Sequence, residues 1–344
     1  MKIVIDGFGG DNAPLDVLLG SEMAVKEYGI ELVITGDEKK LKSLASEKNI
    51  SLEHIEIVDA PTIIPVEEDP TFILKKYKDC SMSVGLHMLR NDEADGFVSA
   101  GSTGALIVGS ATIVGRIKGI KRPAIATLIP TLVGKEGSYL LIDAGGNHEC
   151  RPEMLAQFAI MGSAYMDKIL ARPNSTVGIL NIGTEETKGL ALQVNAYQIL
   201  KKSPVNFIGN VEARGLPLEE CDIVVTDGFT GNIALKLTEG MAISFSKALK
   251  GIFKKSPITM LGAVCVNGGI ADIKEKMNTS KAGGAPILGL KKPVIKAHGN
   301  SNPEAFKNAI RQAKLCVEQN VVGEIEISLA KLAEVSPQNE EISE

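Results

Sequence analysis

The sequence predicts an α/β protein whose mostly parallel sheet is flanked by helices. Short runs of β-branched and other apolar residues alternate with longer segments whose apolar residues recur at helical spacing. Most of the short runs end in Gly, Asn, Ser, Thr or Asp, as strands do where the chain turns into a helix. The 344 residues suffice for one large α/β unit or for two lobes.

The first part of the chain alternates regularly between the two kinds of element. Strands are predicted at 3–6, 31–35 and 55–58, and helices at 14–28, 38–48 and 70–90. Pro14 suits the first turn of its helix because its missing N–H has no partner there. The last helix is expected to break near Cys80. Residues 59–69, with two prolines, are predicted to form an irregular loop.

The rest of the chain continues the alternation. Strands are predicted at 96–98, 139–142, 177–180, 205–208, 223–225 and 294–297. Residues 124–128 and 139–141 are expected to pair around a loop at 130–137. Helices are expected up to Val114, from Pro152 and from Pro303. We expect a single α/β unit over 1–335, a helical hairpin insertion at about 233–280, and a disordered acidic tail at 336–344.

Polar residues gather at the predicted strand ends. Parallel sheets bind ligands outside the carboxyl ends of their strands, so these ends are expected to form one shared cleft. The six ends are 99–104, 143–147, 181–186, 209–212, 227–232 and 298–302. Gly, Asn and Ser are also ordinary loop formers, but six such loops favour a shared cleft.

Composition excludes several classes of protein. The formal net charge of −5, an aromatic content of 4% and the absence of Trp argue against nucleic-acid binding. Five scattered Cys residues suggest reduced thiols. We expect no signal peptide and no bilayer-spanning segment, because a strand is predicted to begin at once and no apolar run is long enough. The chain is therefore expected to be cytoplasmic.

The common cofactor and nucleophile motifs are missing. The segment 7–12 lacks the last Gly of a dinucleotide fingerprint, and there is no P-loop. The four His residues do not have metal-ligand spacing, so neither a metal nor an organic cofactor is expected. Ser99 and Ser102 lie beside glycines without the spacing of a nucleophile elbow, which makes an acyl-serine route a weak hypothesis.

The segment 223–232 and two other residues carry the candidate chemistry. A strand, a tight polar turn and a helix place a helix N-terminus at the sheet end, where its N–H groups favour an anion. Lys188 is predicted in the first turn of a helix, bound either to an anionic ligand or to Glu185. His298 follows a predicted buried strand, and its role is either that of a proton donor or that of a structural hydrogen-bonding group. Asn232 is expected to cap the helix and could also contact substrate.

A basic window near the end of the chain surrounds an apolar segment. Residues 247–296 contain ten Lys and two acidic residues, a net charge of +8, and they enclose the apolar segment 257–266. This segment either lies buried in a core or dimer interface, or forms a tip that contacts an acidic protein or an anionic membrane. The candidate contact residues are Lys250, Lys254, Lys255, Ile258, Met260, Leu261 and Val264.

Seven ordered motifs together resemble the bacterial phosphate acyltransferases, which form acyl phosphate from acyl-acyl-carrier-protein and inorganic phosphate. They span residue 1 to about residue 320. They are Asp6 with Gly9-Gly10-Asp11-Asn12-Ala13-Pro14, Ser99-Ala100-Gly101 with Thr103-Gly104-Ala105, Asn181-Ile182-Gly183 with Glu185-Glu186-Thr187-Lys188-Gly189, Phe207-Ile208-Gly209-Asn210-Val211-Glu212, Asp227-Gly228-Phe229-Thr230-Gly231-Asn232, Gly283-Gly284-Ala285-Pro286 and Ala297-His298-Gly299. Ser102 stands where that family is expected to have Asn, and Gly146 and His148 are also departures.

The resemblance implies a fold similar to isocitrate and isopropylmalate dehydrogenases and phosphate acetyltransferases. It further implies a homodimer, a hairpin at the inner face of the cell membrane, and a downstream membrane glycerol-phosphate acyltransferase that uses the product. We expect Lys188, Asn232 and His298 to be catalytic. The expected substrate-binding residues are Asp6, Gly10, Asn12, Ser99, Gly101, Ser102, Thr103, Asn147, Asn181, Glu185, Asn210, Glu212, Asp227, Gly228, Thr230, Gly231, Gly283 and Gly284.

Two other functions fit parts of the pattern. A pyridine-nucleotide dehydrogenase of related fold is disfavoured by the missing fingerprint. A non-catalytic module that binds lipid or carrier protein would use the same surfaces without turnover. Binding of NAD or NADP would favour the first, and binding of carrier protein without thiol release would favour the second.

Overall fold

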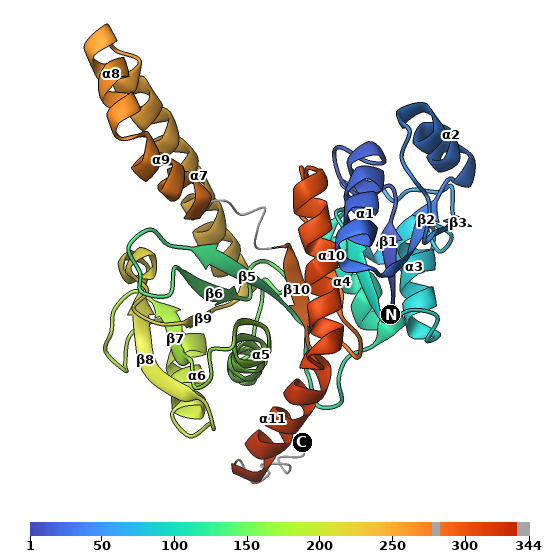
Figure 1. The fold of residues 1–344 in the computed structure, drawn as a ribbon. Helices are drawn as coiled ribbons and strands as arrows, with labels where there is room; N and C mark the ends of the chain where they lie inside the picture. Colours follow the sequence, from blue (N-terminus) through green and yellow to red (C-terminus); the bar gives the residue numbers. More distant parts are fainter. Residues whose placement is uncertain (277–282, 336–344) are drawn as a thin grey trace.

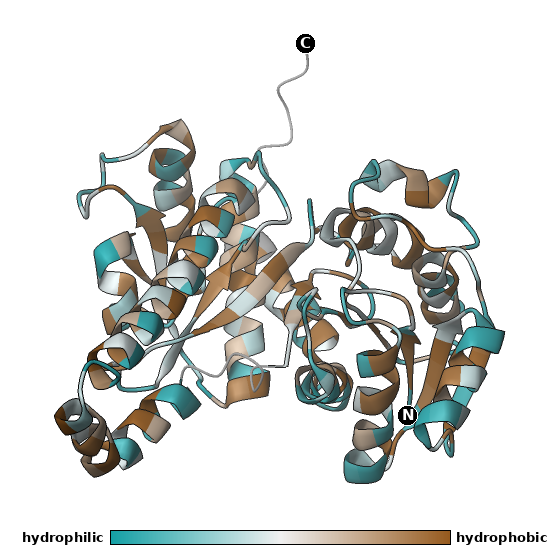
Figure 2. Ribbon diagram, turned by 90° about the horizontal axis from the view of Figure 1, so that it is seen from above, coloured by the Kyte–Doolittle hydropathy of each residue, from teal (hydrophilic) through white to brown (hydrophobic). Residues whose placement is uncertain are grey.

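The computed structural model describes residues 1–276 and 283–335. Eleven strands form one sheet in the order β3-β2-β1-β4-β11-β10-β5-β6-β9-β7-β8. Helices cover the sheet on both sides, and the molecule has two lobes that share this sheet (Figures 1 and 2). The predicted disordered tail at 336–344 lies outside the described residues. The predicted class, a mostly parallel α/β fold, is confirmed.

The first lobe is built from parallel strands at one end of the sheet. Its strands are β1 (Lys2–Asp6), β2 (Glu31–Gly36), β3 (Ile55–Asp59), β4 (Gly96–Ser99) and β11 (Val294–Lys296). Its helices are α1 (Leu15–Tyr28), α2 (Glu38–Lys48), α3 (Ser81–Arg90), α4 (Thr103–Gly109) and α10 (Pro303–Glu318). Short helical turns cover Pro70–Leu74 and Ser110–Val114. The helix predicted at 70–90 is therefore split into two elements, with the break before Ser81.

The second lobe continues the sheet on the other side. Its strands are β6 (Ser138–Ile142), β7 (Thr176–Asn181), β8 (Asn206–Glu212) and β9 (Ile223–Val225). It also contains α5 (Pro152–Leu170), α6 (Ala191–Leu200), the turn Ala213–Leu218 and the start of α7 (Gly228–Phe253). The strand predicted at 205–208 instead continues to Glu212, so the expected loop at 209–212 lies within β8.

Three antiparallel pairings join the lobes. β10 (Ala285–Leu288) pairs with β11 and with β5 (Ala124–Pro130), and β5 pairs with β6 as predicted. These reversals make the strands of the second lobe run opposite to those of the first. The polar strand ends consequently fall into two groups, one on each lobe. β10 was not predicted.

A helical hairpin extends from the second lobe (Figure 1). α7 leads to a short helix at the tip, α8 (Pro257–Cys265), and α9 (Asn267–Lys276) then runs back along α7. No residue of α8 is buried. Along α7, the apolar residues at helical spacing are more than half exposed rather than packed in a core. They are Phe229, Ile233, Leu237, Met241, Phe245 and Ile252, and we call them the α7 stripe.

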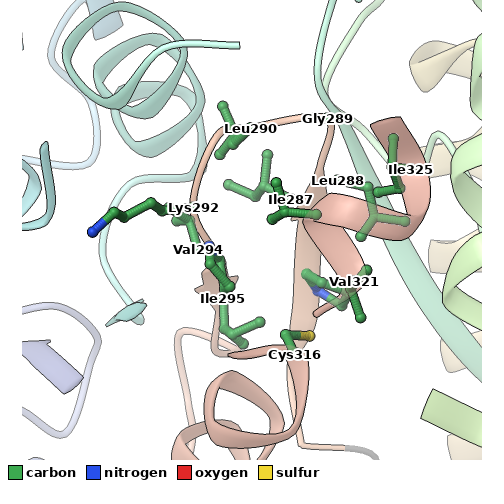
Figure 3. Close-up of a pocket in the computed structure, with 13 residues that line it drawn as sticks. Ile287, Leu288, Gly289, Leu290, Lys292, Val294, Ile295, Cys316, Val321 and Ile325 are labelled. Carbon is green, nitrogen blue, oxygen red and sulfur yellow. The ribbon is translucent and has the colours of Figure 1, made fainter. Parts of the chain in front are cut away.

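The end of the chain packs on both lobes. α10 lies against α1, and α11 (Val321–Val335), which was not predicted, packs against α5. A cavity of about 20 Å³ lies between β10, β11 and these two terminal helices (Figure 3). Its labelled side chains are apolar except Lys292, whose ammonium group points away from the cavity. Because the polar strand ends do not line it, this cavity is not part of the candidate site.

Candidate active site at the strand ends

A buried carboxylate organises the strand ends of the first lobe. Ser81 donates a hydrogen bond to Oδ1 of Asp6 and Ser99 donates to Oδ2, both at 2.6 Å. Burial raises the pKa of Asp6, and the two serine hydrogen bonds oppose this rise. The Ser99 hydroxyl in turn accepts the Gly101 N–H at 3.0 Å. Asp6 therefore holds together the start of α3 and the loops that follow β1 and β4.

Lys296 is a partly buried cation that sequence reasoning missed. Its Nζ donates hydrogen bonds to the carbonyl oxygens of Ala100, at 3.1 Å, and Ala297. Burial lowers the pKa of Lys296 to about 8, although Asp6 and Asp11 act in the opposite direction. One feature of the sequence could have indicated Lys296 as a site residue: it ends an apolar strand directly before the 297–299 motif.

Replacing Lys296 with Met is expected to remove a pH-dependent part of the stability. Because the folded-state pKa is about 8 instead of 10.5, the unfolded chain binds more protons between these values. The contribution of Lys296 to the free energy of unfolding therefore grows as the pH rises from 8 to 10.5, and is lost as the pH falls through 8. Denaturant unfolding should show wild type gaining up to about 3 kcal/mol relative to the variant over this window. A constant difference, as expected for exposed Lys39→Met, would contradict the prediction.

The loops after β1 and β11 are joined directly. The Asp11 N–H donates to the Gly299 carbonyl at 2.7 Å, and Asn12 Nδ2 donates to the Ser301 carbonyl at 3.4 Å. Gly10 has a φ of +100°, and a Cβ there would lie 2.9 Å from the Gly299 oxygen. These contacts fix the loop that carries His298.

His298 faces the long helix of the other lobe. Its Nδ1 accepts the Asn300 N–H at 3.4 Å, and its Nε2 lies 3.9 Å from Oε1 of Glu239 on α7. The side chain is 59% exposed. A His between a fixed loop and an acidic group is suitable for proton transfer or for hydrogen bonding to an oxyanion.

A second buried carboxylate organises the other lobe. Asp143 accepts backbone N–H groups from Ile125, Gly145, Gly146 and Asn147 at 2.7–3.2 Å, and the Asn147 side-chain amide at 2.7 Å. Burial raises the pKa of Asp143, and these donors lower it. Asn147 Nδ2 also donates to the Pro123 carbonyl at 2.8 Å. Asp143, which was not among the predicted site residues, therefore fixes this loop.

The N-terminus of α7 is capped by Asp227, which corrects the prediction that Asn232 caps it. The Asp227 carboxylate accepts both the N–H and the hydroxyl of Thr230 at 2.8 Å. The Gly228 N–H donates to the Asn147 carbonyl at 2.6 Å, and the Gly231 N–H donates to the Asp227 carbonyl at 2.9 Å. Three amides that were expected to be available to an anion are thus bonded within the protein.

Glycine is required where this turn meets the Asp143 loop. A Cβ on Gly231 would lie 1.9 Å from the Asp143 carbonyl oxygen, and one on Gly228 would lie 2.6 Å from the Asn147 nitrogen. Asn232, one residue further on, lies beside Gly145 and is exposed. Within residues 1–276 and 283–335, the Asn232 amide has no hydrogen-bond partner. The close approach thus presents this amide to solvent at the lobe's strand ends.

Lys188 lies in an exposed loop and not in the first turn of a helix, because α6 begins at Ala191. Its N–H donates to the Glu185 carbonyl at 3.1 Å, and its carbonyl accepts Asn181 Nδ2 at 3.0 Å. The described part of the chain supplies no ion-pair partner for its ammonium group, so the suggested pair with Glu185 is absent. Asn181 ends β7, which pairs with β9, and this brings the loop beside the turn at 226–227.

The remaining predicted residues have mainly structural contacts. Asn210 and Glu212 lie in β8, where Asn210 Nδ2 donates to the Glu185 carbonyl at 2.8 Å and Glu212 pairs with Arg214 at 2.6 Å. Ser102 is the N-cap of α4 and accepts the Ala105 N–H at 3.5 Å, while Thr103 is exposed. A Cβ on Gly283 or Gly284 would lie within 3 Å of the carbonyl oxygens of Asn308 or Lys296, so these glycines permit close packing.

Two helices bring the groups of strand ends toward each other. α7 begins after the Asp227 turn and carries Glu239, which lies opposite His298. On the other helix, α4, Ile107 lies 3.4 Å from the position that a Cβ on Gly146 would take. The side chains of Asn232, Lys188 and His298 are each exposed. An amide, an ammonium group and an imidazole are groups that can bind an anion and stabilise a developing oxyanion. Among the described residues, no group of three His, Cys, Asp or Glu has the geometry of a metal site. Such groups are suitable for a group-transfer enzyme that acts by binding an anion and stabilising charge.

The comparisons specify the kind of transfer. A family model described as "Fatty acid synthesis protein" matches residues 1–324. The chain is 45% identical to the phosphate acyltransferase of Thermoanaerobacterium thermosaccharolyticum, covering 95% of this chain and 96% of the relative. It is 44% identical to that of Thermoanaerobacter pseudethanolicus, with coverage of 97% and 99%. The chain belongs to this family of phosphate acyltransferases. It is an acyltransferase of fatty acid and phospholipid synthesis.

Solved structures confirm the predicted fold. A phosphotransacetylase from Streptococcus pyogenes superposes with a TM-score of 0.63 at 17% identity, covering 94% of each chain. A branched-chain phosphotransacylase from Enterococcus faecalis gives a TM-score of 0.56 at 13% identity, covering 92% of this chain and 99% of the other. At these identities the likeness establishes the fold alone.

Proposed function

We propose that the enzyme transfers an acyl group from the thioester of acyl carrier protein to inorganic phosphate. The acyl phosphate formed would feed glycerophospholipid synthesis. The observation that carries this proposal is the set of exposed nitrogen groups on Lys188, Asn232 and His298. Asn232 lies near the start of α7, and His298 lies opposite the same helix about two turns further on. The names of the relatives support the same reaction.

The chemistry requires little beyond positioning and charge stabilisation. A phosphate oxygen attacks the thioester carbonyl carbon, and a tetrahedral oxyanion develops. The carbon–sulfur bond then breaks, and the thiol leaves with a proton supplied by phosphate or solvent. Asn232 and His298 would donate hydrogen bonds to the oxyanion. Lys188 would hold phosphate, which is an anion at neutral pH. Because a thiol is a good leaving group, no strong general acid is required.

Trapping the product tests this reaction directly. The enzyme would be incubated with phosphate and an acyl-acyl-carrier-protein thioester, and hydroxylamine would convert acyl phosphate to a hydroxamate. We expect phosphate-dependent hydroxamate formation in proportion to phosphate-dependent thiol release, each measured above the direct cleavage of the thioester by hydroxylamine in a control without enzyme. Thiol release without hydroxamate would contradict the proposal. A thermal shift with NAD or NADP but not with phosphate or carrier protein would favour the dehydrogenase alternative, and binding without turnover would favour a non-catalytic module.

We further propose that the enzyme is a homodimer joined through the α7 stripe. More than half of each stripe side chain is exposed, and a contiguous apolar helix face of this length is unusual on a monomer. Changing Leu237 and Met241 together to Glu should shift the molar mass in analytical ultracentrifugation from dimer toward monomer, because charge would enter the interface. An exposed pair on α2, Lys39→Glu with Lys40→Glu, serves as the control. A monomeric wild type would refute this proposal.

The α8 tip is proposed to contact the inner face of the cell membrane. Ile258, Leu261 and Val264 are 68–83% exposed, and Lys250, Lys254 and Lys255 are exposed beside them. No helix among the described residues is long and apolar enough to cross a bilayer. Changing Ile258 and Leu261 to Asp should abolish sedimentation with anionic vesicles, because apolar side chains insert at the interface. Retained sedimentation, or loss of turnover with soluble substrate, would contradict a purely peripheral role.

Together these proposals state where the enzyme acts and where its product goes. It would act in the cytoplasm and associate peripherally with the membrane. There the acyl phosphate would be passed to a glycerol-phosphate acyltransferase. Residues 1–335 would work as one catalytic unit, with the hairpin as its membrane contact.

A further inference from the structure

A basic surface lies on the loop between α4 and β5. Its exposed members are Arg116, Lys118, Lys121 and Arg122, and Lys291 lies beside them across the pairing of Arg116 with Leu290. We call these five residues the basic ridge. The sequence contains no acidic residue from Gly96 to Lys135. The ridge is thus a concentration of positive charge on a protein whose net charge is −5.

The ridge is held rigidly by its backbone. The Ile117 N–H donates to the Gly289 carbonyl and the Lys291 N–H donates to the Gly115 carbonyl, both at 3.0 Å. The Gln157 side chain of α5 then clamps the loop. It accepts the Lys121 N–H at 2.8 Å and donates to the Gly119 carbonyl at 2.9 Å. A rigid surface loses little conformational entropy when a partner binds to it.

Apart from Arg116, which bonds backbone carbonyls of its own loop, the cations of the ridge make no ion pair within the described chain. Nearby Lys292 pairs with Asp92 at 2.6 Å, but Lys118, Lys121, Arg122 and Lys291 form no ion pair with any described residue. Like charges held together without counter-charges repel one another and lower stability. Since the loop is already fixed by backbone and Gln157 contacts, these cations are not needed for its conformation. Their arrangement favours an acidic partner.

The ridge adjoins the candidate active site. Arg122 is followed by Pro123, whose carbonyl accepts Asn147 Nδ2 at 2.8 Å. The Asn147 carbonyl accepts the Gly228 N–H in the first turn of α7, four residues before Asn232. A partner bound on the ridge would therefore lie close to the groups proposed to act on the thioester.

Resting on the proposed function, we propose that the basic ridge is the docking surface for the acidic face of the acyl carrier protein. The unpaired cations call for a partner with an acidic face, and the acyl carrier protein is the macromolecular substrate of the proposed reaction. The position of the ridge disfavours an anionic membrane, because the loop between α4 and β5 runs on the side of the molecule away from α8 (Figure 1). The carrier protein then docks at the lobe junction, and the α8 tip remains available to the membrane.

Charge reversal on the ridge tests this assignment. The variant Lys118→Glu/Lys121→Glu/Lys291→Glu keeps Arg116, which bonds backbone carbonyls, and Arg122, which adjoins the site. We expect its KM for acyl-acyl-carrier-protein to rise at least about tenfold. Its kcat and KM with an acyl-pantetheine thioester, which lacks the carrier protein, should not change. The control Lys39→Glu/Lys75→Glu/Lys78→Glu makes the same change in net charge at exposed positions elsewhere.

The outcomes separate the two levels of the proposal. If wild type makes no acyl phosphate from acyl-acyl-carrier-protein and phosphate, the proposed function fails. In that case, isothermal titration with carrier protein that lacks an acyl group still tests the ridge. Weaker binding by the ridge variant than by the control supports docking there. Equal affinity of the two variants overturns it, as does a ridge variant that loses anionic-vesicle binding while its affinity for carrier protein is unchanged.

Discussion

Asp143→Ala is expected to lower the free energy of unfolding by about 3 kcal/mol or more, which is among the largest effects of any single substitution in this chain. The Asp143 carboxylate accepts hydrogen bonds from four backbone N–H groups and from the Asn147 amide. Removing it leaves these donors without their acceptor beside a buried strand end. Each unsatisfied buried donor costs about 1–3 kcal/mol, partly recovered where water enters. Urea denaturation monitored by circular dichroism would measure the change.

A matched control comes from the same lobe. Asp167 on α5 is exposed, and Asp167→Ala should change the free energy of unfolding by less than about 0.5 kcal/mol. Asp143→Asn should lie between the two, because one oxygen acceptor remains while the new amide group faces N–H donors. Equal stabilities of the Asp143→Ala and Asp167→Ala variants would show that the Asp143 network does not stabilise the fold.

Asn232→Ala is expected to reduce kcat by about 10²-fold while leaving the fold intact. The loss of one oxyanion donor typically has this effect, and the Asn232 amide makes no hydrogen bond with the described residues that its removal would break. His298→Ala should likewise lower kcat. Lys188→Ala should mainly raise the KM for phosphate, because it removes the cation proposed to hold the anion. Steady-state assays of thiol release at varied phosphate would separate these effects.

Controls for the catalytic assignment come from the same lobe. Lys201 is exposed and pairs with Glu186 at 3.3 Å, so Lys201→Ala should alter neither constant measurably. Unchanged kcat and phosphate KM in both Lys188→Ala and His298→Ala would refute the assignment of these two residues. A melting temperature of Asn232→Ala far below that of wild type would point to a structural role for Asn232.

Local pattern was sufficient to predict most of the fold. Apolar runs and helical spacing located α2 at its observed bounds and predicted the pairing of β5 with β6. The end of β8 was missed because Gly209 and Asn210 resemble a loop, yet pairing with β7 continues the strand to Glu212. Here the tertiary pairing overrides the local preference of these residues.

The candidate site was harder to predict, because its geometry depends on partners distant in sequence. Asn232 and Asp227 are both suitable cap residues, and only the bonds from Thr230 show that Asp227 is the cap. Lys296 gave little signal in the sequence because its burial depends on loops that begin near residues 6 and 100. The two groups of strand ends could not be anticipated either, since β10, which reverses the sheet direction, was not predicted.

The length of α7 has a consequence for how the product would leave. Asn232 and Phe253 lie on one continuous helix, and 21 residues at 1.5 Å each separate them by roughly 30 Å. If the α8 tip rests on a bilayer with α7 along the membrane normal, chemistry at Asn232 would take place at this height above the lipid headgroups. The acyl chain then cannot remain at the site and enter the bilayer at the same time. In that setting synthesis and delivery would be successive events, and the release of an amphiphilic product into the intervening water would be a step that can limit the overall flux.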